Sequence, residues 1–200
     1  MPARIPVLDK SPFALDPRPL EEMGSAHAGI LATSRALRSL HLGGLVAANL
    51  PLKNRQRGFS EGQMIESLVL LQTLGGDGPE DISLLAEDPC LVRGLGYEPP
   101  KASAARTFLN RFHDDVNAAW FTIALLAYNT ASAIKSLCLE GEERTARFKR
   151  YRLLVIEIAG RMSRSQCKLR LRLHATPKTI GRIQKIWEVF DLPTQATAFS

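Results

Sequence analysis

The chain has 200 residues, of which 45% are hydrophobic, and a formal net charge of +6. This size fits one domain or two small ones, and the apolar content argues against a wholly disordered chain. The three cysteines are odd in number and far apart, so we expect neither a disulfide framework nor a zinc site. Reduced thiols and a first segment without an apolar signal sequence predict a cytoplasmic protein.

The positive charge is concentrated in the C-terminal part. Residues 1–115 hold 12 basic and 14 acidic side chains, whereas residues 116–200 hold 14 basic and 6 acidic ones. Between Arg144 and Lys185 there are 13 Lys and Arg side chains and a single acid, Glu157. Such a density attracts polyanions, of which nucleic acid is the commonest large one. A solvated basic face without a partner and a membrane surface are the alternatives on charge alone.

The first elements are expected to be an arm and a helix. Residues 1–24 are rich in proline and show little periodicity, which predicts a flexible arm. A helix is expected from Ser25 to Leu40, stopped by Gly43–Gly44. A short basic loop then contains Lys53, Arg55 and Arg57.

A series of helices is predicted downstream. Ser60 and Gln63 form a capping-box pattern ahead of an apolar stripe, and this helix is expected to end at Gly75–Gly76. Three shorter helices follow, starting at Pro79, after Asp88–Pro89 and at Ser103. The last one, to about residue 113, has a buried stripe and a polar face. The arrangement fits either a helix-turn-helix or plain helical packing.

The next segment, Ala118 to Leu137, is almost entirely apolar. It carries no charged side chain from Val116 to Ile134, a stretch of 19 residues, so a transmembrane helix is one interpretation. Several Asn, Thr and Ser residues dilute it, and no second span follows. The prediction is therefore a helix buried in the protein core.

The C-terminal residues are predicted to form a hairpin and a helix. The run from Arg150 through Ile156 resembles a strand that ends at Ala159–Gly160, and residues 167–174 alternate with period two. In the second strand the leucines and Cys167 face a core, while Lys168, Arg170 and Arg172 form an outward row. Thr176–Pro177 starts a final helix that reaches Phe190.

Several segments together resemble the DDE group 1 transposases of bacterial insertion sequences. RGFSEGQMIESLVLL (57–71) and ARTFLNRFHDD (105–115), with shorter matches at 43–45, 75–81 and 87–89, are similar to the N-terminal region of that family. NAAWFTIALLAYN (117–129) is similar to its C-terminal region. The resemblance covers about residues 25–175. In the family a ribonuclease-H-like catalytic domain lies between the two regions, and here they meet near Asp115 to Asn117.

The resemblance implies an internally deleted transposase. We expect a mainly α fold with a small β-hairpin (α+β). It would comprise the arm 1–24, a helical region 25–115 and a basic region 116–200, without the ribonuclease-H-like core. Without that core, some apolar surface of the helix from Ala118 is expected to be exposed. The family uses three carboxylates to hold divalent metal such as Mg²⁺, and no position here matches them. The expectation is therefore no catalytic residue, no metal ligand, no cofactor and no enzymatic activity.

The implied function is DNA binding without strand transfer. The implied partners are insertion-sequence ends and, in addition, full-length transposase or a second copy of the chain, with no membrane. A poorly folded relic and a small protein-interaction module are the alternatives. Family DNA-end recognition is attributed to the N-terminal part, which makes Arg57, Lys101, Arg106 and Arg111 candidates. The charge concentration adds Arg147, Lys149, Arg150, Arg152, Arg161, Arg164, Lys168, Arg170 and Arg172.

Overall fold

The computed structural model describes residues 11–16, 18, 24–50, 58–165 and 168–190. These residues form a mainly helical fold with a small sheet, as expected. The α-helices are α1 (Ile30–Ser39), α2 (Leu42–Asn49), α3 (Glu61–Leu74), α4 (Ser83–Ala86), α5 (Pro89–Leu95), α6 (Ala102–Leu109), α7 (Val116–Cys138), α8 (Phe148–Tyr151) and α9 (Pro177–Val189). The 3-10 helices are η1 (Pro79–Ile82), η2 (Asn110–Asp115) and η3 (Gly141–Glu143), and η4 (Arg152–Ile156) is a π-helix. The strands are β1 (Ala14–Asp16), β2 (Ala159–Ser165) and β3 (Lys168–His174).

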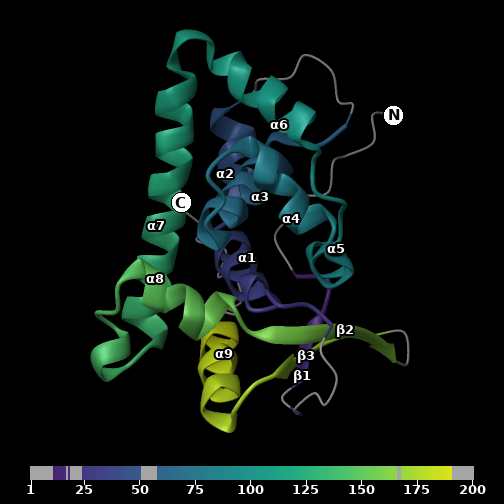
Figure 1. The fold of residues 1–200 in the computed structure, drawn as a ribbon, viewed down its shortest axis with the longest axis vertical. Coiled ribbons are helices and arrows are strands. Elements are labelled where there is room, and N and C mark those ends of the chain that lie inside the picture. The colour runs from purple at the N-terminus through teal and green to yellow at the C-terminus, as the bar shows by residue number, and fades with distance from the viewer. Residues whose placement is uncertain (1–10, 17, 19–23, 51–57, 166–167, 191–200) are drawn as a thin grey trace, which may run out of the picture.

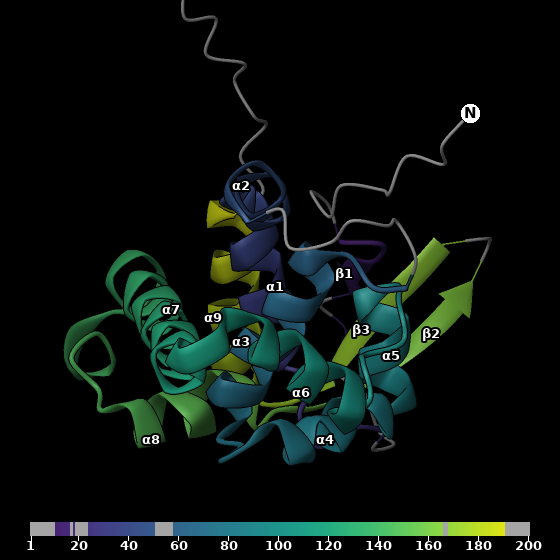
Figure 2. The same ribbon diagram turned by 90° about the horizontal axis from the view of Figure 1, so that it is seen from above.

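Helices α1 and α3 lie at the centre of the molecule (Figure 1). The long helix α7 stands on one side of them and the sheet on the other, as the view from above shows (Figure 2). α3 contacts α1, α2 and α7, and it is buried along nearly its whole length. One contiguous hydrophobic core therefore joins the N-terminal helices to the C-terminal elements.

Local sequence signals set the helix ends correctly in three places. The Ser60 side chain accepts from the Gln63 amide, the capping box is complete, and α3 ends at Gly75 with φ 96°. Asp88 accepts from two backbone amides at the start of α5, and Thr176 caps α9. These caps occupy backbone donors that a helix start otherwise leaves without a partner.

Several predicted helix boundaries were wrong, among them the start of α1, which is Ile30 and not Ser25. Gly43–Gly44 do not stop a helix but lie inside α2, which follows α1 after a turn at His41 with φ 54°. Ser103 does not cap α6, because the N-cap position is Lys101 and its side chain makes no capping bond. α6 also ends earlier than predicted, at Leu109, where the 3-10 helix η2 takes over.

The strand predicted from Arg150 to Ile156 is helical. Tyr151 and Val155 are buried while Leu153 is 59% exposed, which is the four-residue spacing of a helix and not the alternation of a strand. A short apolar run does not distinguish the two structures by its periodicity. The first hairpin strand, β2, instead begins at Ala159, where the predicted strand was to end.

The second hairpin strand is confirmed, and the sheet has a third strand that was not predicted. β2 and β3 are antiparallel, and β1 pairs with β3 in parallel. The prediction of a flexible arm over residues 1–24 is therefore wrong at Ala14–Asp16. Phe13 is buried there and its ring lies 5.0 Å from that of Trp187, so apolar burial holds this segment on the sheet.

Helix α7 is only half buried. Ile123, Ala127 and Ile134 face the core, as predicted, but Phe121 is 63% exposed and Tyr128 is 52% exposed. The prediction of a core helix is thus correct for the inner face, while the outer face leaves apolar surface exposed. Within the described ranges, none of the helices combines the length and apolar character needed to cross a membrane.

The start of α1 lies so close to the π-helix η4 that one methyl group added at Gly29 should strongly reduce the stability of the fold. A Cβ built at Gly29 would lie 1.7 Å from the Val155 carbonyl oxygen, which is backbone. We expect Gly29→Ala to lower the free energy of unfolding by about 3 kcal/mol, since overpacking forces the backbone to shift. Gly181→Ala is the matched control, because a Cβ there meets no atom within 4 Å. Urea denaturation measures both, and equal stability of Gly29→Ala and the wild type would contradict the packing.

Candidate nucleic-acid interface

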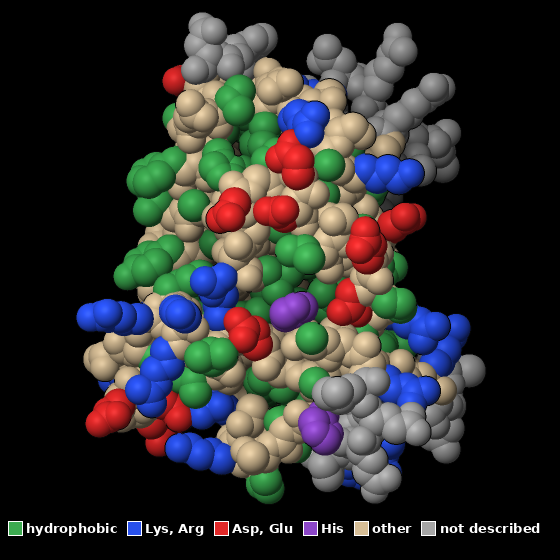
Figure 3. Space-filling view, in the orientation of Figure 1, with side chains coloured by type: hydrophobic (Ala, Val, Ile, Leu, Met, Phe, Trp, Pro, Cys, Tyr) green, Lys and Arg blue, Asp and Glu red, His purple; other side chains and the backbone are tan. Residues whose placement is uncertain are grey.

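The predicted DNA-binding residues fall into three groups in the structure, and Arg57 lies outside the described residues. One group surrounds α6, one surrounds α8, and one lies on the hairpin. α6 is at one end of the molecule, and α8 and the hairpin lie towards the other end on opposite sides (Figures 1 and 2). Lys and Arg side chains gather around α8 and around the hairpin in the space-filling view (Figure 3).

The α6 group, Lys101, Arg106 and Arg111, lies in a mixed electrostatic environment. Arg106 donates to Glu80, with Nε 2.8 Å from Oε1, and both side chains are exposed. The hydrogen bond from Arg106 lowers the pKa of Glu80. Lys101 and Arg111 are also exposed, but they are separated from the other two groups. DNA-groove binding by α6 stays a prediction.

The hairpin group is set by the register of β2 and β3. Arg161 lies opposite Arg172 and Ser163 lies opposite Arg170, so these side chains share one face of the sheet. Lys168 follows on the same face of β3, as its period-two spacing predicts. Arg164 differs, because it pairs with Leu169 on the other face and lines a hollow of about 510 Å³ with Arg93.

Asp16 on β1 places a carboxylate among the hairpin cations. It lies opposite Arg172 in the register, and it accepts from Arg172 Nε at 2.9 Å and from Arg18 Nη2 at 2.8 Å. Arg170 Nη1 is 4.0 Å away. Hydrogen bonds from Arg18, and then from Arg172, hold the pKa of Asp16 well below its usual range although burial opposes them. The sequence prediction missed Asp16 because it assigned this residue to an arm.

The α8 group has more accessible charge than the hairpin. Arg147, Lys149 and Arg150 are exposed, as is the neighbouring Arg144, which was not among the predicted residues. Within the described part of the chain none of the four makes an ion pair. Arg152 behaves differently: it is half-buried and its Nη1 donates to the Leu74 carbonyl at the end of α3, 3.0 Å away. Arg152 therefore supports the fold, whereas the other four present positive charge to solvent.

The acidic side chains of the turn before α8 form ion pairs with basic side chains of α9. Glu143 accepts from Arg182 Nη2 at 2.7 Å and from its Nε at 2.9 Å, and Lys178 lies 3.5 Å away. Glu140 pairs with Lys185. These groups line a pocket of about 570 Å³, in which the carboxylates are already paired with the cations of α9. The basic charge of this stretch is thus neutralised at α9 and left free at α8.

Metal ligands and reactive thiols are two other kinds of chemical group from which a site can be built. No set of three or more His, Cys, Asp and Glu side chains is placed there to hold a metal ion. Cys90 and Cys138 are free and buried, and burial raises the pKa of their thiols to about 12 and about 11. Both thiols are therefore protonated at neutral pH, and neither is an activated nucleophile.

Comparisons with protein-family models, with curated proteins and with solved structures found no match to this chain.

Proposed function

We propose that this chain is a DNA-binding remnant of a DDE group 1 transposase that does not cleave or join DNA. The family resemblance of residues 57–71, 105–115 and 117–129 motivates the assignment to a transposase. We infer the loss of strand transfer because no position of the chain matches the metal-binding carboxylates of the family. In the cell, binding would take place in the cytoplasm, at insertion-sequence ends, where it would compete with or join an intact transposase.

The observation that carries DNA binding is the unpaired charge at α8. Four exposed cations within seven residues, Arg144 to Arg150, repel one another and gain free energy when phosphates approach. The hairpin supports the same function, since Arg161 and Arg172 lie directly opposite each other on one face of the sheet, where Asp16 pairs with Arg172.

A protein-interaction module is the second candidate, favoured by the exposed apolar side chains of α7. An apolar contact of this kind buries surface and depends little on salt. Salt dependence therefore separates it from phosphate contact. A poorly folded relic is the third alternative, and the contiguous core counts against it.

Salt titration with a labelled duplex tests the proposal. If the four α8 cations together with Arg161 and Lys168 contact phosphates, the logarithm of the association constant should fall with the logarithm of salt concentration with a slope of about −5. Fluorescence anisotropy between about 50 and 200 mM salt measures this slope. Absence of binding at the lowest salt, or a slope near zero, would reject phosphate-driven DNA binding.

A further inference from the structure

The outward face of α7 is aromatic and carries no charge. Phe121, Leu125 and Tyr128 are spaced by four and three residues, which places them on one side of the helix, and all three are exposed. From Val116 to Ile134 the chain contains no Lys, Arg, Asp or Glu. This face forms the apolar edge on the α7 side of the molecule in Figure 3.

Tyr128 is the first member of an aromatic row that crosses from α7 to α8. Its ring lies 6.2 Å from Phe148 with an interplanar angle of 30°, and Phe148 lies 5.8 Å from Tyr151. Tyr151 is fully buried, and its hydroxyl is 3.3 Å from Thr33 Oγ1. The row is thus fixed at its inner end and exposed at Tyr128, so little rotamer freedom is lost when a flat group stacks there.

Unpaired cations lie beside this row. Arg147 and Lys149 flank Phe148 in the chain, Arg150 follows, and all three are exposed without an ion pair among the described residues. Of the nearby acids, Glu140 and Glu143 are held by α9, while Glu142 and Glu157 are exposed. The surface therefore combines an accessible ring with positive charge, which are the two features that single-stranded nucleic acid uses.

The exposed ring and the neighbouring cations together favour a nucleic acid with unpaired bases over an apolar protein segment or a DNA duplex. An apolar protein segment would gain nothing from the cations of α8. A DNA duplex would use the cations but not the ring, because its bases are stacked on each other. A single strand uses both, since bases stack on aromatic side chains while basic groups follow the phosphates.

We propose that α7 and α8 form a binding site for single-stranded nucleic acid, in which a base stacks on Tyr128 and Arg147, Lys149 and Arg150 hold the adjoining phosphates. This inference rests on the proposed nucleic-acid binding and adds to it a preference for a strand with unpaired bases. It predicts that affinity depends on the presence of bases and not on phosphate number alone.

The experiment compares labelled oligo-dT with an abasic oligonucleotide of the same length, so that the number of phosphates is constant. The wild-type chain should bind oligo-dT more tightly by roughly 5- to 150-fold, the effect of one stacked base. Tyr128→Leu keeps the site apolar but removes the ring, and it should abolish this preference. Tyr128→Trp should retain it. Leu84→Ala, which changes an exposed apolar side chain on α4, is the control and should behave as the wild type.

The outcomes separate this inference from the proposed function. Equal affinity of the wild type for the two oligonucleotides, or a preference that survives Tyr128→Leu, overturns the stacking site while duplex binding stands. A preference lost in both Tyr128→Leu and Tyr128→Trp also overturns it, provided that both variants melt like the wild type. Absence of binding to duplex and to both oligonucleotides overturns the proposed function together with the inference.

Discussion

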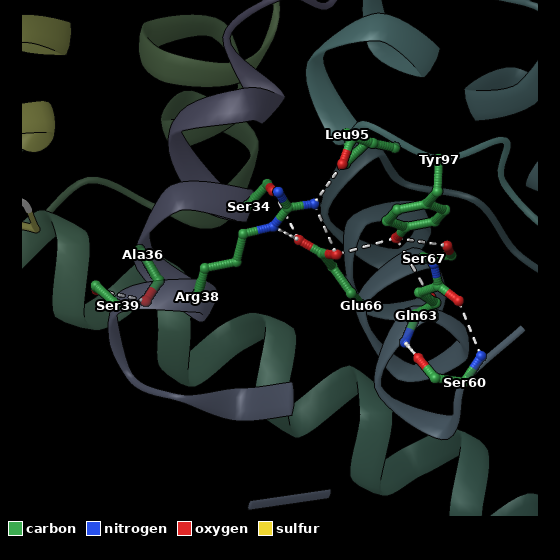
Figure 4. Close-up of polar contacts among 10 residues, drawn as sticks. All are labelled: Ser34, Ala36, Arg38, Ser39, Ser60, Gln63, Glu66, Ser67, Leu95 and Tyr97. Atoms are coloured by element: carbon green, nitrogen blue, oxygen red, sulfur yellow. Dashed lines mark hydrogen bonds and ion pairs between the residues drawn. The ribbon is translucent and has the colours of Figure 1, made fainter. Parts of the chain in front are cut away.

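Replacing Glu66 by leucine is expected to lower the free energy of unfolding by about 3–5 kcal/mol. Glu66 and Arg38 form an ion pair in which each side chain is only 3% exposed, with Nε 2.7 Å from Oε1. Removing the carboxylate leaves the guanidinium buried without its counter-charge, and the cost of such an unpaired charge is of this order. Figure 4 shows that the pair lies between α1 and α3.

Further hydrogen bonds make the pair a junction between three segments. Arg38 Nη2 also donates to the Leu95 carbonyl at 2.8 Å, and Ser34 donates to Glu66 Oε1 at 2.7 Å. The Tyr97 hydroxyl donates to Oε2 at 3.0 Å. Burial, followed by the charge of Glu66, raises the pKa of Tyr97 well above its usual value, so its hydroxyl keeps the proton that it donates. α1, α3 and the end of α5 are thus joined through one carboxylate.

A double variant separates the cost of an unpaired charge from the value of the pair. Arg38→Met alone should cost about as much as Glu66→Leu, whereas the two together should recover much of the loss, because a buried pair is often replaceable by apolar side chains. Urea denaturation followed by circular dichroism gives the three values. The wild type should unfold in one cooperative transition, which a poorly folded relic would not show. A cost below about 1 kcal/mol for each single variant would contradict the buried pair.

Local patterns in the sequence predicted the helix ends but not this junction. Ser60, Asp88 and Thr176 are caps whose partners lie within three residues, so the sequence contains the whole interaction. Arg38 and Glu66 are 28 residues apart on different helices. Glu66 lies in an otherwise apolar helix, which marks it as unusual, but no local rule names its partner.

The same limit explains the errors in the C-terminal half. β3 was predicted because its strict alternation is a local signal, whereas β1 has three residues and depends on pairing with β3, more than 150 residues away. The position of Asp16 beside Arg170 and Arg172 was consequently not predicted. Among the candidate binding residues, charge density predicted the exposed α8 cations. It did not predict that Arg152 would support α3 or that α9 would be neutralised.

Replacing Arg147, Lys149 and Arg150 together by glutamine is expected to weaken duplex binding about 500-fold at 0.1 M salt. Each phosphate contact contributes a salt slope of about −0.9, which corresponds to about eightfold in affinity at 0.1 M relative to 1 M salt. Three lost contacts should therefore also reduce the slope by about 2.7. Anisotropy titrations at several salt concentrations measure both quantities on the same protein.

The matched control removes the same number of charges at the other end of the molecule. Lys101, Arg106 and Arg111, all replaced by glutamine, change the net charge equally, but Arg106 already pairs with Glu80 and acidic side chains surround η1. If attraction depended on net charge alone, the two triple variants would lose affinity equally. If α6 read the DNA, as the family resemblance implies for the N-terminal region, the control would lose more. A larger loss at α8 is the outcome expected from its unpaired cations, because only charges without a protein partner can exchange water and counterions for phosphate at little cost.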